Sequence, residues 1–95
     1  MFDKMKQFME MKKQADRIKR ELDTATVESH EGGIKIVING SQNVKFIEID
    51  ADLVQGDQKG NLESNLLKSI NAAIRKSQEL AAQKMKAIMP SMPGL

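Results

Sequence analysis

Basic side chains are the residues of this 95-residue chain whose types and spacing most clearly suggest a chemistry. They recur near both ends of the chain so that, on helices, each set would share one face. The first set is Lys6, Lys13, Arg17 and Arg20, and the second is Lys68, Arg75 and Lys86 with Lys76 beside it. Because Lys and Arg neutralise phosphates and release their counterions, these sets favour a polyanionic partner.

The distribution of charge supports the same interpretation. The net charge is only +2, but residues 1–23 carry seven Lys or Arg against five Asp or Glu, and residues 64–95 carry five against one. Residues 24–63 carry three against seven. Two basic ends around an acidic middle indicate a polyanion contacted by the ends. Ordinary solvated helix faces are the alternative.

Metal and nucleophile chemistry has little support in the composition. The chain has no cysteine and one histidine, His30, which makes zinc and iron sites improbable. Ser29 and His30 are adjacent, so on a strand they point to opposite faces and cannot form a nucleophile–base pair. We therefore expect His30 to be an ordinary turn residue. The lack of cysteine also fits a reducing cytosol.

Three alternating carboxylates, Glu48, Asp50 and Asp52, are the remaining candidate for metal binding. A calcium loop that began at Glu48 would need Gly at Leu53 and Glu at Lys59, so that match fails. We expect Glu48 and Asp50 to line the solvent face of a strand and to help terminate the sheet. The same acidic band should repel DNA and so restrict contact to the helices. The sequence contains no phosphate-cradling loop and no acid, base and oxyanion set, so we predict no enzyme, no cofactor and no small-molecule substrate.

Two long helices must position the basic residues. In the first, the seam Phe8, Met11, Ala15, Ile18 and Leu22 follows 3-4-3-4 spacing, and at about 100° per residue the basic set lies nearly opposite it. In the second, an apolar stripe steps by three or four from residue 62 to residue 88, with the other basic set opposite. Lys84 falls on the apolar side, which suggests that the last turns run past the globular body.

Three strands are predicted between these helices. Ile34, Ile36 and Ile38 alternate with polar or smaller residues, and β-branched residues suit a pleated sheet. Asn39-Gly40 is a common turn dipeptide because both residues tolerate positive φ. The expected architecture is a single α+β domain, residues 1–95. It comprises a helix over about 3–22, an antiparallel meander of strands at about 24–30, 34–39 and 44–50, a helix over about 58–89 and a mobile tail 90–95.

The stock of large core residues is small, because aromatic residues make up only 3% of the chain. A partner chain that completes the core is therefore expected, and a homodimer is the simplest choice. The N-terminus lacks the apolar run of a signal peptide, and no segment approaches the roughly 18 apolar residues of a membrane span. We expect no membrane partner.

The sequence resembles the YbaB/EbfC family of bacterial nucleoid-associated proteins. The resemblance is carried by the Met/Lys/Gln-rich opening helix, by the central segments 33–40 and 44–50, by residues 62–73 and by Met92-Pro93-Gly94. It implies a cytoplasmic, nucleoid-located homodimer whose sheets associate and whose long helices project like tweezers to contact duplex DNA. Ala51 stands where the family often has Pro, and the region of Gly56 and Gly60 is unusually rich in glycine.

Three other hypotheses remain open at this stage. The apolar stripes Phe2-Met5-Met9 and Met85-Met89-Met92 would suit a protein-interaction module, since thioethers adapt to many surfaces. The low net charge would suit a family member that has lost DNA binding. A metal-dependent enzyme that uses Glu48, Asp50 and Asp52 is the third.

Overall fold

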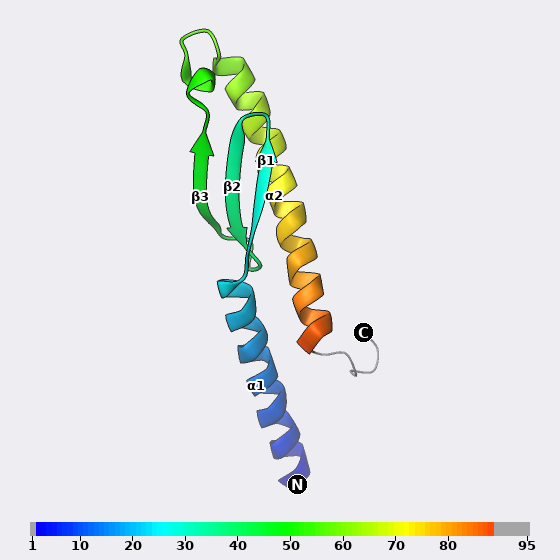
Figure 1. Ribbon diagram of the computed structural model, residues 1–95. Coiled ribbons are helices and arrows are strands. Elements are labelled where there is room, and N and C mark those ends of the chain that lie inside the picture. The colour runs from blue at the N-terminus through cyan, green and yellow to red at the C-terminus, as the bar shows by residue number, and fades with distance from the viewer. Residues whose placement is uncertain (1, 89–95) are drawn as a thin grey trace.

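The computed structural model describes residues 2–88 and shows two long helices around a three-stranded sheet (Figure 1). The elements are α1 (Phe2–Thr24), β1 (Thr26–Glu31), β2 (Ile34–Asn39), β3 (Val44–Ile49), the 3-10 turn η1 (Ala51–Val54) and α2 (Lys59–Ile88). The predicted α+β class and the order helix, meander, helix are confirmed. The molecule is elongated, with extents of 68 × 20 × 16 Å.

The sheet is an antiparallel meander in the order β1-β2-β3. The β2 side chains Ile34, Ile36 and Ile38 point toward α2 and are fully buried, as their alternation predicts. Ser29 pairs with Ile36 and is buried, whereas its neighbour His30 is exposed on the other face. An irregularity between Val37 and Ile38 shifts the pairing with β3 by one residue.

Small residues let α2 lie close to the sheet. Ser69, Ala72, Ala73 and Ser77 are its buried residues. The Ser69 hydroxyl donates to the Glu31 carbonyl oxygen at 3.1 Å, and the Ser77 hydroxyl donates to the Asn39 carbonyl oxygen at 2.7 Å. These bonds satisfy backbone acceptors at two points along the sheet, where an unpaired buried acceptor would destabilise the fold. They therefore fix α2 along its length.

Helix α1 leaves the sheet and extends beyond it (Figure 1). Residues 3–17 are all exposed, and packing begins only at Ile18, Glu21 and Leu22, which are half-buried. The helix ends at Thr24, whose hydroxyl donates to the Arg20 carbonyl oxygen at 2.8 Å. The last-turn carbonyl groups lack intrahelical partners, and that of Leu22 instead accepts from the Gly40 amide at 2.9 Å.

The β2–β3 turn differs in detail from the prediction. The non-glycine residue with positive φ is Gln42, at 64°, and not Asn39, and Gly40 is not among the glycines with positive φ. Glycine at position 40 is required by space, because a Cβ there would lie 2.9 Å from Leu22 Cδ2 and 3.1 Å from the Leu22 carbonyl oxygen. The end of α1 therefore passes directly against this turn.

The chain between the sheet and α2 forms a single 3-10 turn, η1, which includes Leu53. Helix α2 begins at Lys59, and the Leu62 amide donates to the Gln58 carbonyl oxygen at 2.8 Å. The expected tail 90–95 and the last predicted helical residue, Met89, lie outside the described residues. Within residues 2–88, neither helix contains a stretch that is long and apolar enough to cross a membrane.

Candidate nucleic-acid interface

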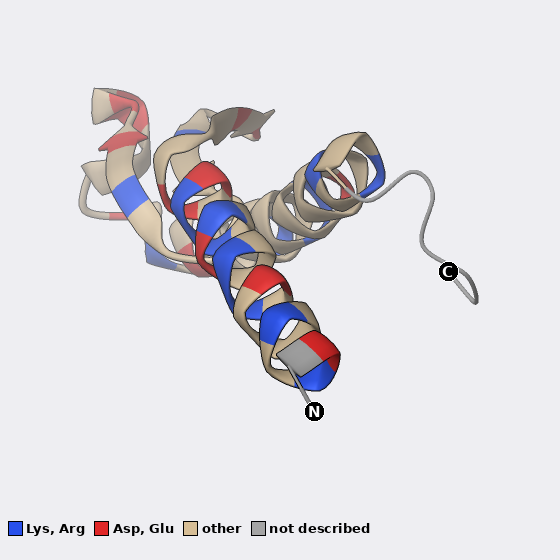
Figure 2. Cartoon of the chain, turned by 90° about the horizontal axis from the view of Figure 1, so that it is seen from below, with Lys and Arg blue, Asp and Glu red and all other residues tan. Residues whose placement is uncertain are grey.

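The basic face of α1 lies on the side of the helix that does not pack. Lys6, Lys13, Arg17 and Arg20 are all exposed. At about 100° per residue they lie roughly opposite the seam that ends in the half-buried Ile18 and Leu22. Figure 2 shows Lys and Arg recurring along α1 with acidic residues between them. Hence this face is free to contact a polyanion, although its net charge is modest.

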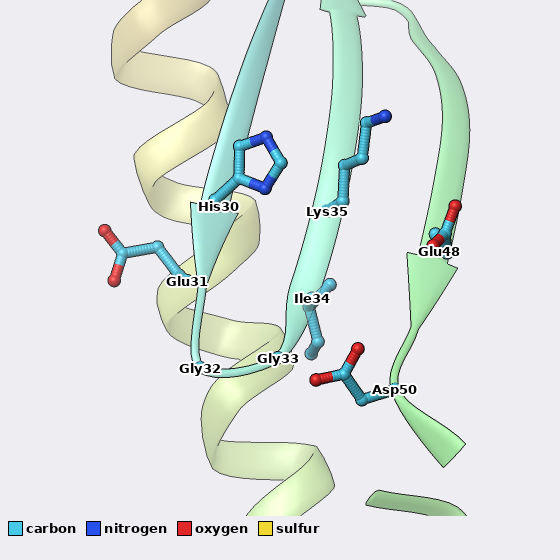
Figure 3. Close-up of a pocket in the computed structure, with 8 residues that line it drawn as sticks. All are labelled: His30, Glu31, Gly32, Gly33, Ile34, Lys35, Glu48 and Asp50. Atoms are coloured by element: carbon cyan, nitrogen blue, oxygen red, sulfur yellow. The ribbon is translucent and has the colours of Figure 1, made fainter.

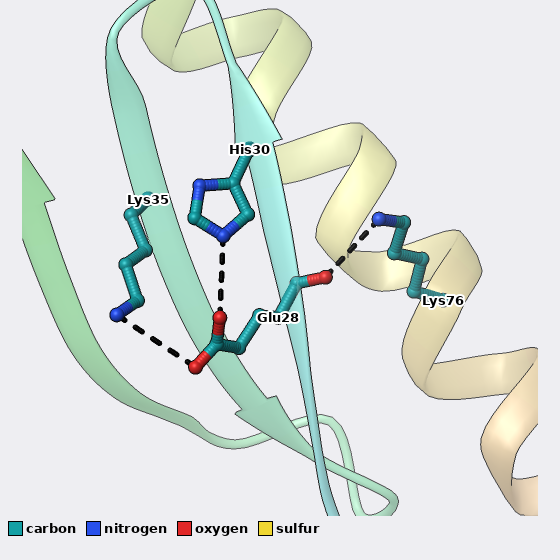
Figure 4. Close-up of polar contacts among 4 residues, drawn as sticks. All are labelled: Glu28, His30, Lys35 and Lys76. Atoms are coloured by element: carbon teal, nitrogen blue, oxygen red, sulfur yellow. Dashed lines mark hydrogen bonds and ion pairs between the residues drawn. The ribbon is translucent and has the colours of Figure 1, made fainter.

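The basic face of α2 lies away from the sheet. Lys68, Arg75 and Lys86 are exposed, on the side roughly opposite the buried Ser69 and Ser77. Lys76 is different, because its ammonium donates to the Glu28 carbonyl oxygen of β1 at 3.1 Å (Figure 4). The structure thus places Lys76 beside the sheet and leaves the other three on an open helix surface.

The single chain does not bring the two basic faces together. Near its end, α1 faces α2 through Glu21, whose carboxylate lies 3.7 Å from the Lys84 ammonium. On α2 the basic set lies roughly opposite Lys84, whereas on α1 Arg17 lies one turn before Glu21 on the same side of the helix. The last turns of α2 extend past the sheet (Figure 1), and there the half-buried Lys84 packs beside the end of α1. Lys84 lies on the apolar side of α2 because that side faces α1 there, although α1 is distant in sequence.

A polar cluster on the open face of the sheet was not predicted. The Glu28 carboxylate accepts a hydrogen bond from His30 Nε2 at 3.2 Å, and the Lys35 ammonium lies 3.7 Å away from it (Figure 4). The hydrogen bond from His30 and then the charge of Lys35 lower the pKa of Glu28. Lys35 also lies 5.9 Å from the centroid of the Phe46 ring, within the range of a cation–π contact. The sequence could have suggested this contact, because Glu28 and His30 are two residues apart on a strand and their side chains therefore lie on the same face.

A surface hollow of about 320 Å³ opens beside the β1–β2 turn (Figure 3). It is lined by residues 30–35 together with Glu48 and Asp50. Three carboxylates among these residues outnumber the single Lys35, so the hollow repels phosphate. Within residues 2–88, no three His, Asp or Glu side chains are grouped so that they could hold a metal ion.

The two edges of the sheet differ in chemistry. The β1 edge carries exposed Glu28, His30 and Glu31. The β3 edge carries exposed apolar side chains on both faces, with Phe46 at 48% and Ile47 at 45% of full exposure. Within the described chain, β3 pairs only with β2. An open apolar edge strand is a template for pairing with another chain.

The free part of α1 also carries exposed apolar side chains. Met5, Phe8, Met9 and Met11 lie between 59% and 70% of full exposure. On α2, Leu67 and Met85 are exposed at the flank of the stripe that packs on the sheet. The side chain of Phe2, together with Met89 and Met92, lies outside the described residues, so only part of the two predicted Met-rich stripes can be placed.

The chain is similar to known DNA-binding and nucleoid-associated proteins. Residues 1–92 match the YbaB/EbfC DNA-binding family. A nucleoid-associated protein of Dictyoglomus thermophilum is 31% identical over 99 aligned residues, which cover 99% of this chain and 95% of the relative. One of Hahella chejuensis is 41% identical over 87 residues, covering 90% and 80%, and one of Syntrophobacter fumaroxidans is 34% identical over 98 residues, covering 99% and 89%.

Proposed function

Because the chain belongs to the YbaB/EbfC DNA-binding family, we propose that it is a nucleoid-associated protein that binds duplex DNA as a homodimer. The observation that carries the proposal is the position of the basic residues, which are exposed on helix faces that packing within the protomer leaves free. The location is the bacterial nucleoid in the cytoplasm, and the role is to organise the chromosome or to regulate genes.

Contacts with the DNA backbone suit these helices better than base reading. Lys and Arg on open helix faces neutralise phosphates whatever the sequence. The basic faces carry no cluster of Asn and Gln such as a recognition helix uses for direct readout. No aromatic side chain alternates with the charges, as stacking on single strands would require. The expected affinity is micromolar in scale at physiological salt.

Dimerisation would place two copies of each basic face on one particle. The β3 edge is the surface best suited to it, because Phe46 and Ile47 project from opposite faces of an edge strand and both are half-exposed. Pairing of two β3 strands, or stacking of the sheets around them, would bury these side chains. That burial would supply the core that the small stock of large residues leaves incomplete in one chain.

A gel-shift titration at several salt concentrations tests DNA binding directly. For four to six neutralised phosphates, the log–log dependence of the binding constant on salt should have a slope of roughly −3 to −6. Replacement of Lys13, Arg17 and Arg20 by Ala should weaken binding to all sequences alike and flatten that slope. The matched control replaces the three lysines of the acidic middle, Lys35, Lys45 and Lys59, by Ala. Equal losses in the two variants would contradict the role of the α1 face.

The dimer is tested by solution mass, measured by light scattering across a concentration series. The unmodified chain should have twice the chain mass, and Phe46→Asp should shift it to the monomer because a charge would be buried at the interface. Val54→Asp is the matched control, since Val54 is exposed and apolar but lies in η1, outside the strands. A stable monomer for the unmodified chain would rule out the dimer.

Docking of an apolar protein partner is a second candidate function. It is favoured by the exposure of Met5, Phe8, Met9 and Met11 on the free part of α1. A pull-down at high salt separates the two functions, because salt screens phosphate contacts and leaves apolar burial intact. A partner retained at high salt and lost on Phe8→Ala would support this candidate.

A further inference from the structure

The end of α1, the β2–β3 turn and the middle of α2 meet around one buried polar residue, Asn39. Its relative exposure is 1%, which is unusual for a side chain that can form four hydrogen bonds. Here the group of residues Asp23, Asn39, Gly40, Ser41 and Ser77 is called the Asn39 junction. None of these residues is basic, so the junction itself is not part of the surface proposed to touch DNA.

The two ends of the Asn39 amide bind different elements. The nitrogen Nδ2 donates to the carbonyl oxygen of Asp23, in the last turn of α1, at 3.1 Å. The oxygen Oδ1 accepts from the backbone amides of Ser41 at 3.0 Å and Asn43 at 2.9 Å, and so closes the turn. One rigid, planar group therefore fixes the end of α1 to the turn that leads into β3.

The neighbouring backbone continues the connection to α2. The Asn39 carbonyl oxygen accepts the Ser77 hydroxyl at 2.7 Å. The Gly40 amide donates to the carbonyl oxygens of Leu22 at 2.9 Å and Ala25 at 3.1 Å, and the Ser41 hydroxyl donates to the Asp23 carboxylate. Both long helices are thus bound to Asn39, and α1 is bound in addition to Gly40 and Ser41 of the turn.

These bonds have a large effect on the position of the far end of α1. Residues 3–17 are exposed and have no buried face to hold them, so the direction of the helix is set where it joins the sheet. The 23 residues of α1 span roughly 34 Å at about 1.5 Å per residue. A tilt of about 10° at the base would move the far end by about 6 Å.

We propose that Asn39 is a positioning residue that sets the direction of α1, and with it the spacing between the basic faces of α1 and α2. The consequence for DNA rests on the proposed function, but the positioning itself does not. Only Asn presents both a donor to Asp23 and an acceptor to two amides in this geometry. Asp would keep the acceptor, lose the donor and bring a charge next to the Asp23 carbonyl oxygen.

The direction of α1 can be measured by pulsed electron spin resonance between two labels. Because the chain has no cysteine, Gln14→Cys on α1 and Gln78→Cys on α2 provide unique exposed sites. Doubly labelled chain is diluted with excess unlabelled chain so that only distances within one chain are read. We expect one narrow distance for the unmodified junction. For Asn39→Asp and Asn39→Ala we expect a shift or broadening of about 3 Å, because a tilt of about 10° acts over the roughly 15 Å between the base of α1 and residue 14.

Asn71 supplies the matched controls, because it is exposed on α2. Asn71→Asp and Asn71→Ala make the same chemical changes away from the junction and should leave the distance unaltered. Far-UV circular dichroism confirms that each variant keeps its helices. Should Asn39→Ala fail to fold, Asn39→Asp and Ser41→Ala still test the tie to Asp23. A folded Asn39→Asp variant with the unmodified distance would overturn the proposal.

DNA binding is then measured on the same variants. If α1 carries one of the contact faces, Asn39→Ala should weaken binding roughly tenfold although no charge is lost, because preorganisation of the two faces is lost. If the unmodified chain binds no DNA, the proposed function fails, while the distance measurement still decides whether Asn39 positions α1. If the unmodified chain binds DNA and the Asn39 variants keep the unmodified label distance, only the positioning role of Asn39 fails.

Discussion

Helices α1 and α2 have similar apolar periodicity and similar basic faces, yet they are held in different ways. The 30-residue α2 buries Ser69, Ala72, Ala73 and Ser77 against the sheet. The 23-residue α1 contacts the rest of the chain through its last two turns, and residues 3–17 are exposed. The apolar periodicity of a helix therefore does not tell whether its apolar stripe is packed, because the neighbouring elements decide it.

The difference has a functional meaning. The basic side chains of α2 lie on a helix that is fixed to the sheet over much of its length, so their spacing is set by the fold. Those of α1 lie on a helix that is fixed at one end, so their position depends on the Asn39 junction. If both faces contact one DNA duplex, the fit is determined by α1.

The largest expected effect separates the packed region from the free one. Ile36 has a relative exposure of 0% and Phe8 of 70%. Replacing Ile36 by Ala should lower the free energy of unfolding by about 2–5 kcal/mol, because it leaves a cavity between sheet and α2. Phe8→Ala should change it by less than about 0.5 kcal/mol. Urea unfolding at one protein concentration measures both, and a large loss for Phe8→Ala would show that another surface covers the free part of α1.

The second prediction compares the two basic faces. Replacing Lys68, Arg75 and Lys86 by Ala, or Lys13, Arg17 and Arg20 by Ala, should each reduce the salt slope of DNA binding by roughly 2 to 3. Adding Asn39→Ala should weaken binding further in the α2 triple variant. It should have little further effect in the α1 triple variant, because coupled changes are not additive. Equal effects of Asn39→Ala in both backgrounds would mean that α1 and α2 do not differ in this way.

The third prediction concerns the ion pair between the two helices. Glu21 and Lys84 are 3.7 Å apart, and both side chains are more than one-third exposed. A double-mutant cycle with Glu21→Ala and Lys84→Ala should give a coupling of about 0–1 kcal/mol in thermal or urea unfolding. A coupling well above that range would indicate that the ion pair, and not the Asn39 junction, holds α1 against α2.

The smallest effect lies on the open face of the sheet. The hydrogen bond from His30 and the charge of Lys35 lower the pKa of Glu28, so the folded state favours the carboxylate. The resulting stabilisation is complete above the usual carboxyl pKa and is lost as the pH falls through the lowered value. A carbon-detected NMR titration should show the pKa of Glu28 rising toward its usual range in His30→Ala, and rising less in Lys35→Ala. The opposite order would contradict this account.

Much of the fold follows from local patterns in the sequence. The alternation of Ile34, Ile36 and Ile38 predicts a buried central strand. The 3-4-3 spacing of Phe8, Met11, Ala15 and Ile18 predicts a helix. Both are local periodicities that the backbone geometry imposes. The exposed position of the basic residues followed in the same way, because a charge opposite an apolar seam faces solvent. The resemblance to the YbaB/EbfC family rested on these same segments.

Pairwise contacts between distant residues could not be read in this way. Gly40 suggested a turn with positive φ, but its role is to admit Leu22, which lies 18 positions earlier in the chain. Lys84 suggested that the end of α2 runs past the globular body, but its contact there with Glu21 of α1 was not predicted. Lys76 belonged to a predicted basic set, yet it donates to the Glu28 carbonyl oxygen. Each of these outcomes depends on which element lies across the contact.

By itself, the sequence determined the types of the elements, their order and the helix faces that carry charge, because these depend on spacing within a few residues. Only the tertiary structure decided the direction of α1, the burial of Asn39 and the exposure of β3. Those features arise where segments far apart in the chain pack together. Burial and hydrogen bonding at such places depend on which segments meet, and spacing within a few residues does not show that.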